Sequence, residues 1–397
     1  MILKHFRFIA LLIVLISNLN SKTVIENGED NSTTKWRVVE GSSDDILNMY
    51  DSELKSRVVE FNGGGSYKLG ATGGSKALNI KGETTISWKM KVTIPYTIYI
   101  LTQTTEGLRY IFYVSTPSRG LKHGFLNGIH HGLGKATLNG RWKTITRDLS
   151  SDLHDAEPDN RIISINGIII NGGNGIRVDD ITIYTPEEKI YINNYIEVNN
   201  SYKLNINSEY FKILQWRFKD FGTPEILDRR GIIRDRDIFE FKIHTTTTNG
   251  KRDLIYTLGE DNLGLIENNR TIHHALGDDR VIGSVWVENY PANSLGMPQA
   301  ITRDLDEDIR DFEPNNHLLK IDSFEVKGSG RVGYIKLLSS VDTNLSKIKK
   351  SNSTSNSSDN LPSEKEINNV GFKIQYLFLY LLLTLLFLNR EKYFKKG

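Results

Sequence analysis

An internal duplication constrains the fold of this 397-residue chain more than any other feature of its sequence. The segment Ile129–Gly134 (IHHGLG) recurs as Ile272–Gly277 (IHHALG), and Ile145–Leu149 (ITRDL) recurs unchanged as Ile301–Leu305. Self-similarity in a fixed order is the sequence signature of a repeated structural unit. The chain is therefore predicted to contain two copies of one unit.

Further landmarks extend the match in both directions. Each Arg-Asp pair is followed at the same spacing by Glu-Pro, and each copy has an earlier Trp-containing segment and an Arg-x-x-x-Tyr pattern. The Arg-x-x-x-Tyr residues are Arg109 with Tyr113 in the first copy and Arg252 with Tyr256 in the second. We place the copies at residues 34–185 and 190–342.

Both copies show the alternation that is typical of β-strands. Apolar and polar residues alternate in Ile86–Val92, Arg109–Val114 and Val178–Tyr184, and Gly, Asn and Asp separate such segments. A period of two predicts strands with one buried face, and the short spacing between turns predicts β-sandwiches. The sequence therefore predicts an all-β protein with two tandem β-sandwich domains of jelly-roll-like form, in which acidic residues after each Arg-Asp pair lie in solvated turns.

The N-terminal 21 residues have the pattern of a secretion signal. Basic residues precede an apolar run, Phe8–Ile16, and small and polar residues follow it. This order predicts a signal peptide over residues 1–21. The chain is thus expected to be exported.

The C-terminal region has three parts with different compositions. Residues 343–370 include a Ser- and Asn-rich tract that cannot form a core and is expected to be a flexible stalk. Residues 371–389 are mostly apolar and residues 390–397 are basic, which predicts one transmembrane helix with its basic end in the cytoplasm. A processed sorting tail is the alternative, although Leu361–Lys365 (LPSEK) matches a sortase signal only in its first two residues.

The overall composition excludes some function classes. Fifty Lys and Arg residues are balanced by 48 Asp and Glu residues, whereas a general nucleic-acid binder needs a basic surface. The chain has no cysteine, which excludes disulfides and thiolate chemistry. Nothing resembles a nucleophile motif, a phosphate loop or a metalloprotease helix, and we expect no enzyme activity.

The duplicated polar residues are the candidates for ligand contacts. A strand sends neighbouring residues to opposite faces, so one His of each pair could be buried while the other faces a ligand. The Arg of each Arg-Asp pair could hold a carboxylate bidentately and fix a loop. The candidate ligand-binding residues are Arg109, Tyr113, His130, His131, Arg147, Asp148, Arg252, Tyr256, His273, His274, Arg303 and Asp304.

Paired carboxylates at the start of a strand are candidates for a metal site. Asp179 and Asp180 precede the alternating segment Ile181–Tyr184 and could hold a structural Ca²⁺, which prefers oxygen ligands. The second copy has Gly333 and Tyr334 at these positions. A calcium site is therefore expected in the first copy alone, with a solvated turn as the alternative.

The landmarks from Ile129 to Tyr184 (IHHGLG, TRDL, EP and VDDI) resemble a repeat of large secreted bacterial surface proteins. More loosely, they resemble carbohydrate-binding modules of the galactose-binding-like jelly-roll type. In such modules the last strand often begins with an Asp pair, one of which binds a structural calcium ion, and this resemblance marks Asp180 as the position to test. The resemblance implies a carbohydrate or another polymer of the cell envelope as the ligand.

Three functions remain open from the sequence. The first is a binding or adhesion protein anchored at the cell surface, with two modules that recognise glycan or another envelope component. The second is a structural spacer without a ligand, and the third is a polysaccharide-active enzyme. A glycan binder should display aromatic side chains on one exposed face, whereas an enzyme needs a cleft with convergent carboxylates whose pKa values are separated.

Overall fold

The computed structural model describes most of the predicted duplicated region. The described residues are 22–115, 121–123, 127–219, 240–257, 264–266, 270–276 and 299–341. The expected signal peptide (1–21), stalk (343–370), transmembrane or sorting segment (371–389) and basic end (390–397) lie outside them. Among the described residues, the helices are too short or too polar to cross a bilayer.

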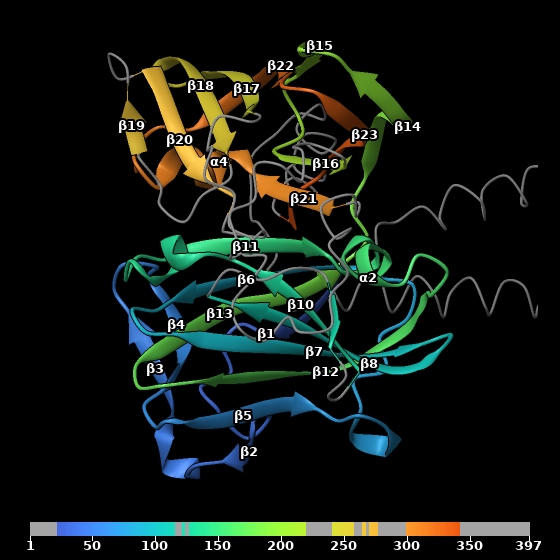
Figure 1. The fold of residues 1–397 in the computed structure, drawn as a ribbon. Coiled ribbons are helices and arrows are strands. Elements are labelled where there is room, and N and C mark those ends of the chain that lie inside the picture. The colour runs from blue at the N-terminus through green and yellow to red at the C-terminus, as the bar shows by residue number, and fades with distance from the viewer. Residues whose placement is uncertain are drawn as a thin grey trace, which may run out of the picture. The chain divides into compact units, whose positions relative to one another are not determined.

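The first sandwich packs a six-stranded sheet against a seven-stranded sheet (Figure 1). The six-stranded sheet contains β11 (Lys143–Asp148), β6 (Thr85–Lys91), β13 (Ile176–Tyr184), β4 (Ser56–Phe61) and β3 (Ile46–Asp51) in this spatial order, with β1 (Lys22–Glu26) paired to β13. The seven-stranded sheet contains β2 (Arg37–Glu40), β5 (Gly65–Gly70), β12 (Ile162–Gly172), β7 (Tyr96–Thr104), β8 (Gly107–Val114), β10 (Gly128–Gly132) and β9 (Leu121–His123).

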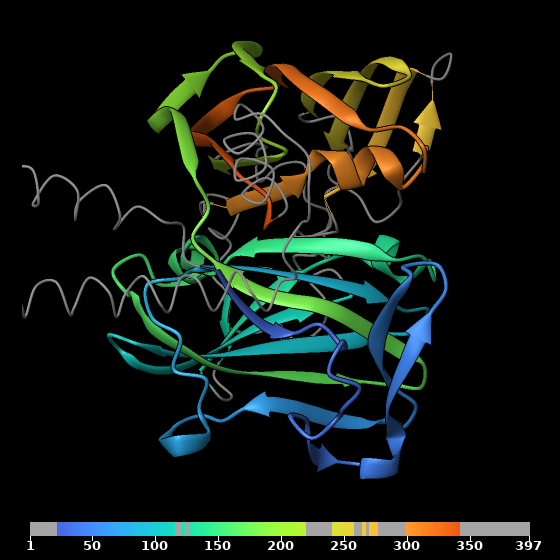
Figure 2. The same cartoon turned by 180° about the vertical axis from the view of Figure 1, so that it is seen from behind.

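The second sandwich packs a four-stranded sheet against a six-stranded sheet (Figure 2). The four-stranded sheet contains β14 (Glu188–Val198), β23 (Gly330–Leu338), β16 (Ile213–Lys219) and β21 (Gln299–Asp304) in this order. The six-stranded sheet contains β15 (Ser201–Ser208), β22 (Leu318–Lys327), β17 (Glu240–Thr247), β18 (Gly250–Thr257), β20 (Thr271–Ala275) and β19 (Gly264–Ile266).

The strand orders confirm that the sequence duplication is a duplication of the fold. The order β11-β6-β13-β4 recurs as β21-β16-β23-β14, and β5-β12-β7-β8-β10-β9 recurs as β15-β22-β17-β18-β20-β19. Even the one parallel pairing within each larger sheet recurs, β8 with β10 and β18 with β20. The described residues are thus mainly β and form β-sandwiches, as predicted, with short helices in addition.

Each sandwich has its own core, which the inward residues of the alternating strands fill. Trp88 lies beside Tyr113 in the first core, and the equivalent Trp216 lies beside Tyr256 in the second. Trp216 also contacts Phe241 and Phe324, with ring centroids 5.3 and 5.6 Å away. Truncation of such an aromatic side chain costs about 3–5 kcal/mol, so these rings dominate the packing between the two sheets.

Two short helices occupy the positions where solvated acidic turns were predicted. Helix α2 (Leu149–Ala156) follows β11, and helix α4 (Leu305–Arg310) follows β21. Their N-caps are Asp148 and Asp304, whose carboxylates accept main-chain N–H groups of the first turn. The prediction of solvated turns was wrong because each helix makes only about two turns. That length allows one apolar i, i+4 pair and no sustained periodicity.

The first sandwich begins earlier than the boundary placed at residue 34. Strand β1 pairs with β13, and the carboxylate of Glu26 is buried next to it. Glu26 accepts hydrogen bonds from the main-chain N–H of Gly28 (2.9 Å) and from Nε1 of Trp36 (3.0 Å). A buried carboxylate stays charged only when such donors surround it. The segment before residue 34 is therefore part of the folded unit.

We predict that Glu26→Ala destabilises the protein by about 2–4 kcal/mol, because it leaves buried N–H donors without an acceptor. Urea unfolding followed by tryptophan fluorescence measures this change. Glu53→Ala is the matched control, since Glu53 forms a mostly exposed ion pair with Lys91 and should change stability by less than about 1 kcal/mol. Equal effects of the two substitutions would contradict a structural role for β1.

Candidate functional site

Four of the residues in and near the predicted motifs form a buried polar cluster in the first sandwich. Arg147 donates from Nε and Nη2 to the two carboxylate oxygens of Asp152, at 3.0 and 2.6 Å. The hydroxyl of Tyr113 donates to the same carboxylate, and Nε2 of His131 lies 3.0 Å from the main-chain oxygen of Asp152. The predicted bidentate Arg–carboxylate pair is therefore present, and it fixes helix α2 to the strands.

The second sandwich contains the same cluster at the equivalent residues. Arg303 donates from Nε and Nη2 to Asp308 at 2.9 and 2.5 Å, and the hydroxyl of Tyr256 lies 2.5 Å from Asp308 Oδ2. Nε2 of His274 again lies 3.0 Å from the main-chain oxygen of Asp308. This identity of contacts explains why the His and Arg landmarks recur in both copies.

Burial sets the protonation states in these clusters. It lowers the pKa of His131 and of His274 to about 4, despite the neighbouring Asp carboxylates. Both imidazoles are then neutral at pH 7, and Nε2 must carry the proton because its partner is a carbonyl oxygen. Burial opposes ionisation of Asp152, but the charge of Arg147 and the hydrogen bonds from Arg147 and Tyr113 together hold the pKa of Asp152 below its usual value. The cluster is a structural ion pair whose Asp carboxylate is buried.

A second duplicated ion pair connects the end of each helix to the larger sheet. Arg109 Nε lies 2.8 Å from Oε2 of Glu157, and Arg252 donates twice to Glu313 at 2.7 Å. Each Glu also accepts from an Asn three residues later. The equal spacing from Arg-Asp to Glu-Pro in the two copies follows from this contact, because it fixes the length of the connection.

The remaining His candidates lie on the other side of their strands. His130 is half-buried with its ring centroid 4.3 Å from that of Phe112, and His273 is buried with Nε2 2.6 Å from Thr257 Oγ1. The expected opposite orientation of the two His residues holds in the first copy, since His131 lies in the buried cluster. In the second copy both His273 and His274 are buried.

Helix α2 and strand β11 of the first copy contact strand β21 and helix α4 of the second copy reciprocally. Asp155, at the end of α2, accepts the main-chain N–H of Ala300 in β21 at 2.8 Å. Asp311, the equivalent residue after α4, pairs at 2.5 Å with Nζ of Lys143 in β11. Equivalent Asp residues of the two copies thus contact equivalent strands, since Asp155 contacts β21 and Asp311 contacts β11.

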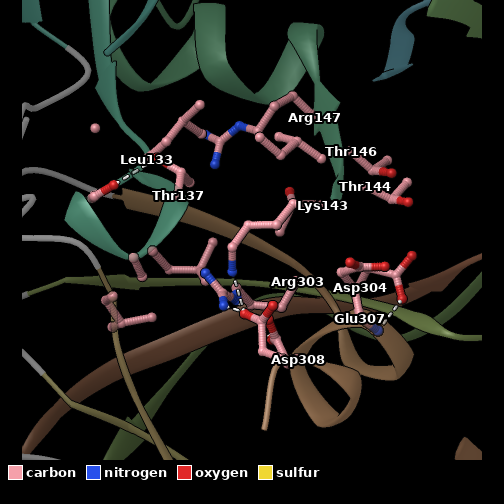
Figure 3. A pocket seen from close by; sticks show the side chains of 18 residues that line it. Leu133, Thr137, Lys143, Thr144, Thr146, Arg147, Arg303, Asp304, Glu307 and Asp308 are labelled. Carbon is pink, nitrogen blue, oxygen red and sulfur yellow. Dashed lines mark hydrogen bonds and ion pairs between the residues drawn. The ribbon is translucent and has the colours of Figure 1, made fainter. Parts of the chain in front are cut away.

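A cavity of about 90 Å³ lies between these elements. Figure 3 shows Lys143 and Arg147 on one side of it and Arg303, Asp304 and Glu307 on the other. Burial raises the pKa of Asp304 to about 7 and also raises that of Glu307. Ligand pockets usually enclose about 300–1,000 Å³, so this charged cavity has room for a few water molecules and is too small for a sugar.

Two groups of residues have the composition of metal ligands. They are His131 with Asp152 and Asp155, and His274 with Asp308 and Asp311. Asp152 and Asp308 already accept from an Arg and a Tyr, while Asp155 and Asp311 make the reciprocal contacts described above. Most of the candidate ligand atoms therefore have protein partners, but the buried Nδ1 of His274 and Oδ1 of Asp155 form no hydrogen bond. Oδ1 of Asp155 lies 3.2 Å from Nη2 of Arg217, and these contacts stabilise the fold.

Asp179 and Asp180 lie at an irregularity in strand β13. Asp180 has a positive φ of 49° and pairs with Nζ of Lys89 at 2.6 Å. Burial and the neighbouring Asp180 raise the pKa of Asp179 to about 7, and Asp179 accepts from Ser56 at 3.2 Å. Ca²⁺ takes six to eight oxygen ligands. Among the described residues, Asp179 and Asp180 belong to no group of three or more His, Asp or Glu ligand atoms, and Asp180 is paired with a Lys cation. The geometry favours an ion pair here, and the calcium site stays a prediction.

The second copy cannot hold an Asp pair at this position. A side chain at Gly333 would place its Cβ 2.1 Å from the main-chain oxygen of Asn194 in β14. Tyr334 keeps the positive φ of its counterpart Asp180, at 51°. The main-chain irregularity is thus shared by both copies, while the carboxylates belong to the first copy alone.

The outer face of the seven-stranded sheet carries a row of residues that do not belong to the first hydrophobic core. The row crosses six adjacent strands through directly opposed residues. Its members are, in order, Arg37, Lys68, Ile169, Tyr99, Phe112 and His130. Five interstrand steps of about 4.8 Å give the row a length of roughly 24 Å.

The aromatic half of this row is continuous. The rings of Tyr99 and Phe112 meet edge to face with centroids 4.6 Å apart, and Phe112 contacts His130 in the same way. Tyr110, two residues before Phe112 on the same face of β8, lies 6.3 Å from it. Tyr99 and Tyr110 are half-buried, so part of each ring is accessible, whereas Phe112 is buried beneath them.

The equivalent row in the second sandwich is charged. It contains Lys203, Glu325, Lys242, Ile255 and His273. Beside it, His244 lies 2.7 Å from Asp253 and 3.1 Å from Glu325. The shared fold therefore tolerates charged side chains where the first copy has aromatic ones.

Of this row, His130 alone was predicted from the sequence, as a candidate ligand contact. Tyr113, also predicted as a candidate, is a core residue with an accessibility of 0%. The available signal was the residue type at outward positions of alternating strands, where Tyr99 and Phe112 replace the usual polar residues. Reading it requires the strand register, which pairs residues that are distant in the chain.

Comparisons with known proteins return structural similarities alone. No family model and no curated protein matches the sequence. A family 11 carbohydrate-binding module of a cellulosomal cellulase of Clostridium thermocellum is similar with 12% identity over 41% of this chain and 94% of the module, at a TM-score of 0.23. A family 61 module in complex with β-1,4-galactotriose is similar with 13% identity over 42% of this chain and 99% of the module, at a TM-score of 0.26.

A family 29 module from Piromyces equi is similar with 8% identity over 42% of this chain and 91% of the module, at a TM-score of 0.22. The chain thus has a distant structural similarity to carbohydrate-binding modules over about 42% of its length.

The raised pKa of Asp304 gives a testable pH dependence. The folded-state pKa is about 7 and the unfolded value is about 3.9, so the folded protein binds this proton more tightly. Stability from this group is fully present below about pH 4 and is lost as the pH rises to about 7. Asp304→Asn keeps an oxygen acceptor at the N-cap and removes the ionisation.

We therefore expect the Asp304→Asn variant to match the wild type near pH 4 and to exceed its stability at pH 8 by about 1–3 kcal/mol. Urea unfolding of both proteins at several pH values measures the difference. If the free energies of unfolding of the two proteins change in parallel across this pH range, ionisation of Asp304 does not destabilise the folded protein.

Proposed function

We propose that this chain binds carbohydrate, and that the outer face of the seven-stranded sheet in the first sandwich is the binding platform. The observation that carries this proposal is the continuous aromatic group of Tyr99, Tyr110, Phe112 and His130 on that face. An aromatic ring can pack against the C–H face of a sugar ring while its polar tip stays in water. Half-accessible tyrosines on a rigid sheet provide such a surface at low entropic cost.

The second copy serves as an internal control for this interpretation. Aromatic residues in strands usually belong to a core, and the inward residues Ile98, Ile111 and Tyr113 do so here. The fold does not require the rings of Tyr99 and Tyr110, because the second sandwich folds in the same way with Lys242 and Asp253 at their positions. A contact outside the fold accounts for their presence.

We further propose that the chain is exported and presents two jelly-roll modules at the cell envelope. Support comes from the apolar run of residues 8–16 after a basic start, from the apolar segment of residues 374–388 before a basic end, and from the absence of cysteine. Protease treatment of intact cells tests this placement. Cleavage of the folded region is expected, and a fully protected chain would contradict it.

The enzyme alternative has weaker support. The cavity carboxylates have separated pKa values, since the pKa of Asp304 is raised and that of Asp308 is lowered, and such separation is a requirement for acid–base chemistry. However, these groups surround about 90 Å³ and Asp308 is held by Arg303. We therefore favour binding over catalysis.

We predict that Tyr99→Ala and Tyr110→Ala each weaken glycan binding by about 5- to 30-fold, because each removes stacking worth roughly 1–2 kcal/mol. A glycan array identifies the ligand, and titration calorimetry measures the change. Tyr50→Ala is the matched control, because Tyr50 is 58% exposed on β3 of the opposite sheet. If no glycan class binds, the result would favour a structural spacer without a ligand.

A further inference from the structure

The opposite end of the aromatic row carries two adjacent cations. Arg37 in β2 is directly opposed to Lys68 in β5, and Lys68 is opposed to Ile169, the neighbour of Tyr99. Both basic side chains are half-buried on this face. Two interstrand steps place Lys68 roughly 10 Å from Tyr99, within reach of one ligand that lies along the row.

These cations differ from three basic residues of the first sandwich that form ion pairs. Lys35, Lys89 and Lys91 each pair with a carboxylate at 2.9 Å or less. In the described part of the chain, neither Arg37 nor Lys68 lies within ion-pair distance of a carboxylate, and Arg37 donates to the main-chain oxygen of Gly70. The exposed carboxylate of Glu40 lies opposite Ser66, in the next row of the sheet.

The two positive charges raise the free energy of this face when no anion is present. Burial and the charge of Arg37 both lower the pKa of Lys68, so its ammonium group lacks a stabilising neighbour. In the second sandwich the equivalent Lys203 stands opposite Glu325. The neighbouring strand thus carries a carboxylate at this sheet position in the second copy, where Glu325 lies 3.1 Å from His244, and an isoleucine, Ile169, in the copy with the aromatic platform.

We infer that the Arg37–Lys68 end of the platform receives an acidic group of the ligand, so that the first sandwich selects an anionic glycan. This inference rests on the proposed function and specifies its ligand class. The aromatic group holds the C–H face of one sugar, and the two cations bind a carboxylate, sulfate or phosphate on the same or a neighbouring sugar. Two adjacent cations on a rigid sheet favour such groups through charge-assisted hydrogen bonds.

The test compares three oligosaccharide probes with the purified full chain. Oligogalacturonate is the acidic probe, its fully methyl-esterified form is the neutral probe of the same backbone, and a sulfated galactan of similar length separates carboxylate from sulfate recognition. We expect the acidic probes to bind at least tenfold more tightly than the neutral one at low salt. The preference should shrink as salt rises, because exposed charges are screened.

The variant Lys68→Gln should reduce the preference for acidic probes by about fivefold or more and leave the affinity for the neutral probe unchanged. Lys203→Gln is the matched control, since it alters the equivalent position of the second sandwich and should change neither affinity. Thermal unfolding of both variants verifies that they fold. Tyr99→Ala should weaken binding of all the probes.

The outcomes separate the inference from the function on which it rests. Equal affinity for the acidic and neutral probes, unchanged in Lys68→Gln and lost in Tyr99→Ala, would overturn the anionic preference and leave carbohydrate binding intact. No binding of any probe or of any glycan on the array would overturn both. A preference that Lys68→Gln and Lys203→Gln reduce equally would show that net charge is responsible and would overturn this site.

Discussion

The buried Arg–Asp pair behind each helix is the interaction on which the rest of each sandwich depends. Arg147 and Arg303 come from a strand of the smaller sheet, while Tyr113 and Tyr256 come from the larger one, and both side chains meet on one Asp carboxylate. The pair thus connects the two layers through a short helix. Loss of either charge would leave the other buried without a partner, which costs about 3–5 kcal/mol, and this explains why both copies retain the same residues.

Much of the fold follows from the sequence, because strand alternation and repeated landmarks report local structure and its duplication. Helices α2 and α4 were missed since Leu149 with Leu153, and Leu305 with Ile309, give one apolar i, i+4 pair each. The candidate site was predicted less well. Arg147 and His131 were candidates for ligand contacts, yet both lie in a buried cluster with Asp152. Burial depends on contacts between residues that are distant in the chain.

Most of the platform residues were missed, whereas residues of the buried cluster were predicted to contact a ligand. Tyr99, Lys68 and Arg37 lie in ordinary strand segments, and nothing local distinguishes an outward aromatic residue from an inward one when a strand contains irregularities. The register shifts in β12 between Ile162 and Ser164 and between Ile165 and Gly167 change which residues face outward. A period-two reading from one end of that strand therefore assigns the wrong face after each shift, and the cross-strand row becomes visible only when the pairing is known.

The reciprocal contacts between the copies bear on how their two surfaces came to differ. An interface in which residue i of one unit meets residue j of the other, and j meets i, is the isologous arrangement of a symmetric homodimer. Asp155 against β21 and Asp311 against β11 follow that arrangement within one polypeptide. Covalent fusion releases such a dimer from symmetry, because each half can then mutate alone. The aromatic row of the first copy and the charged row of the second copy are such a divergence on a shared fold.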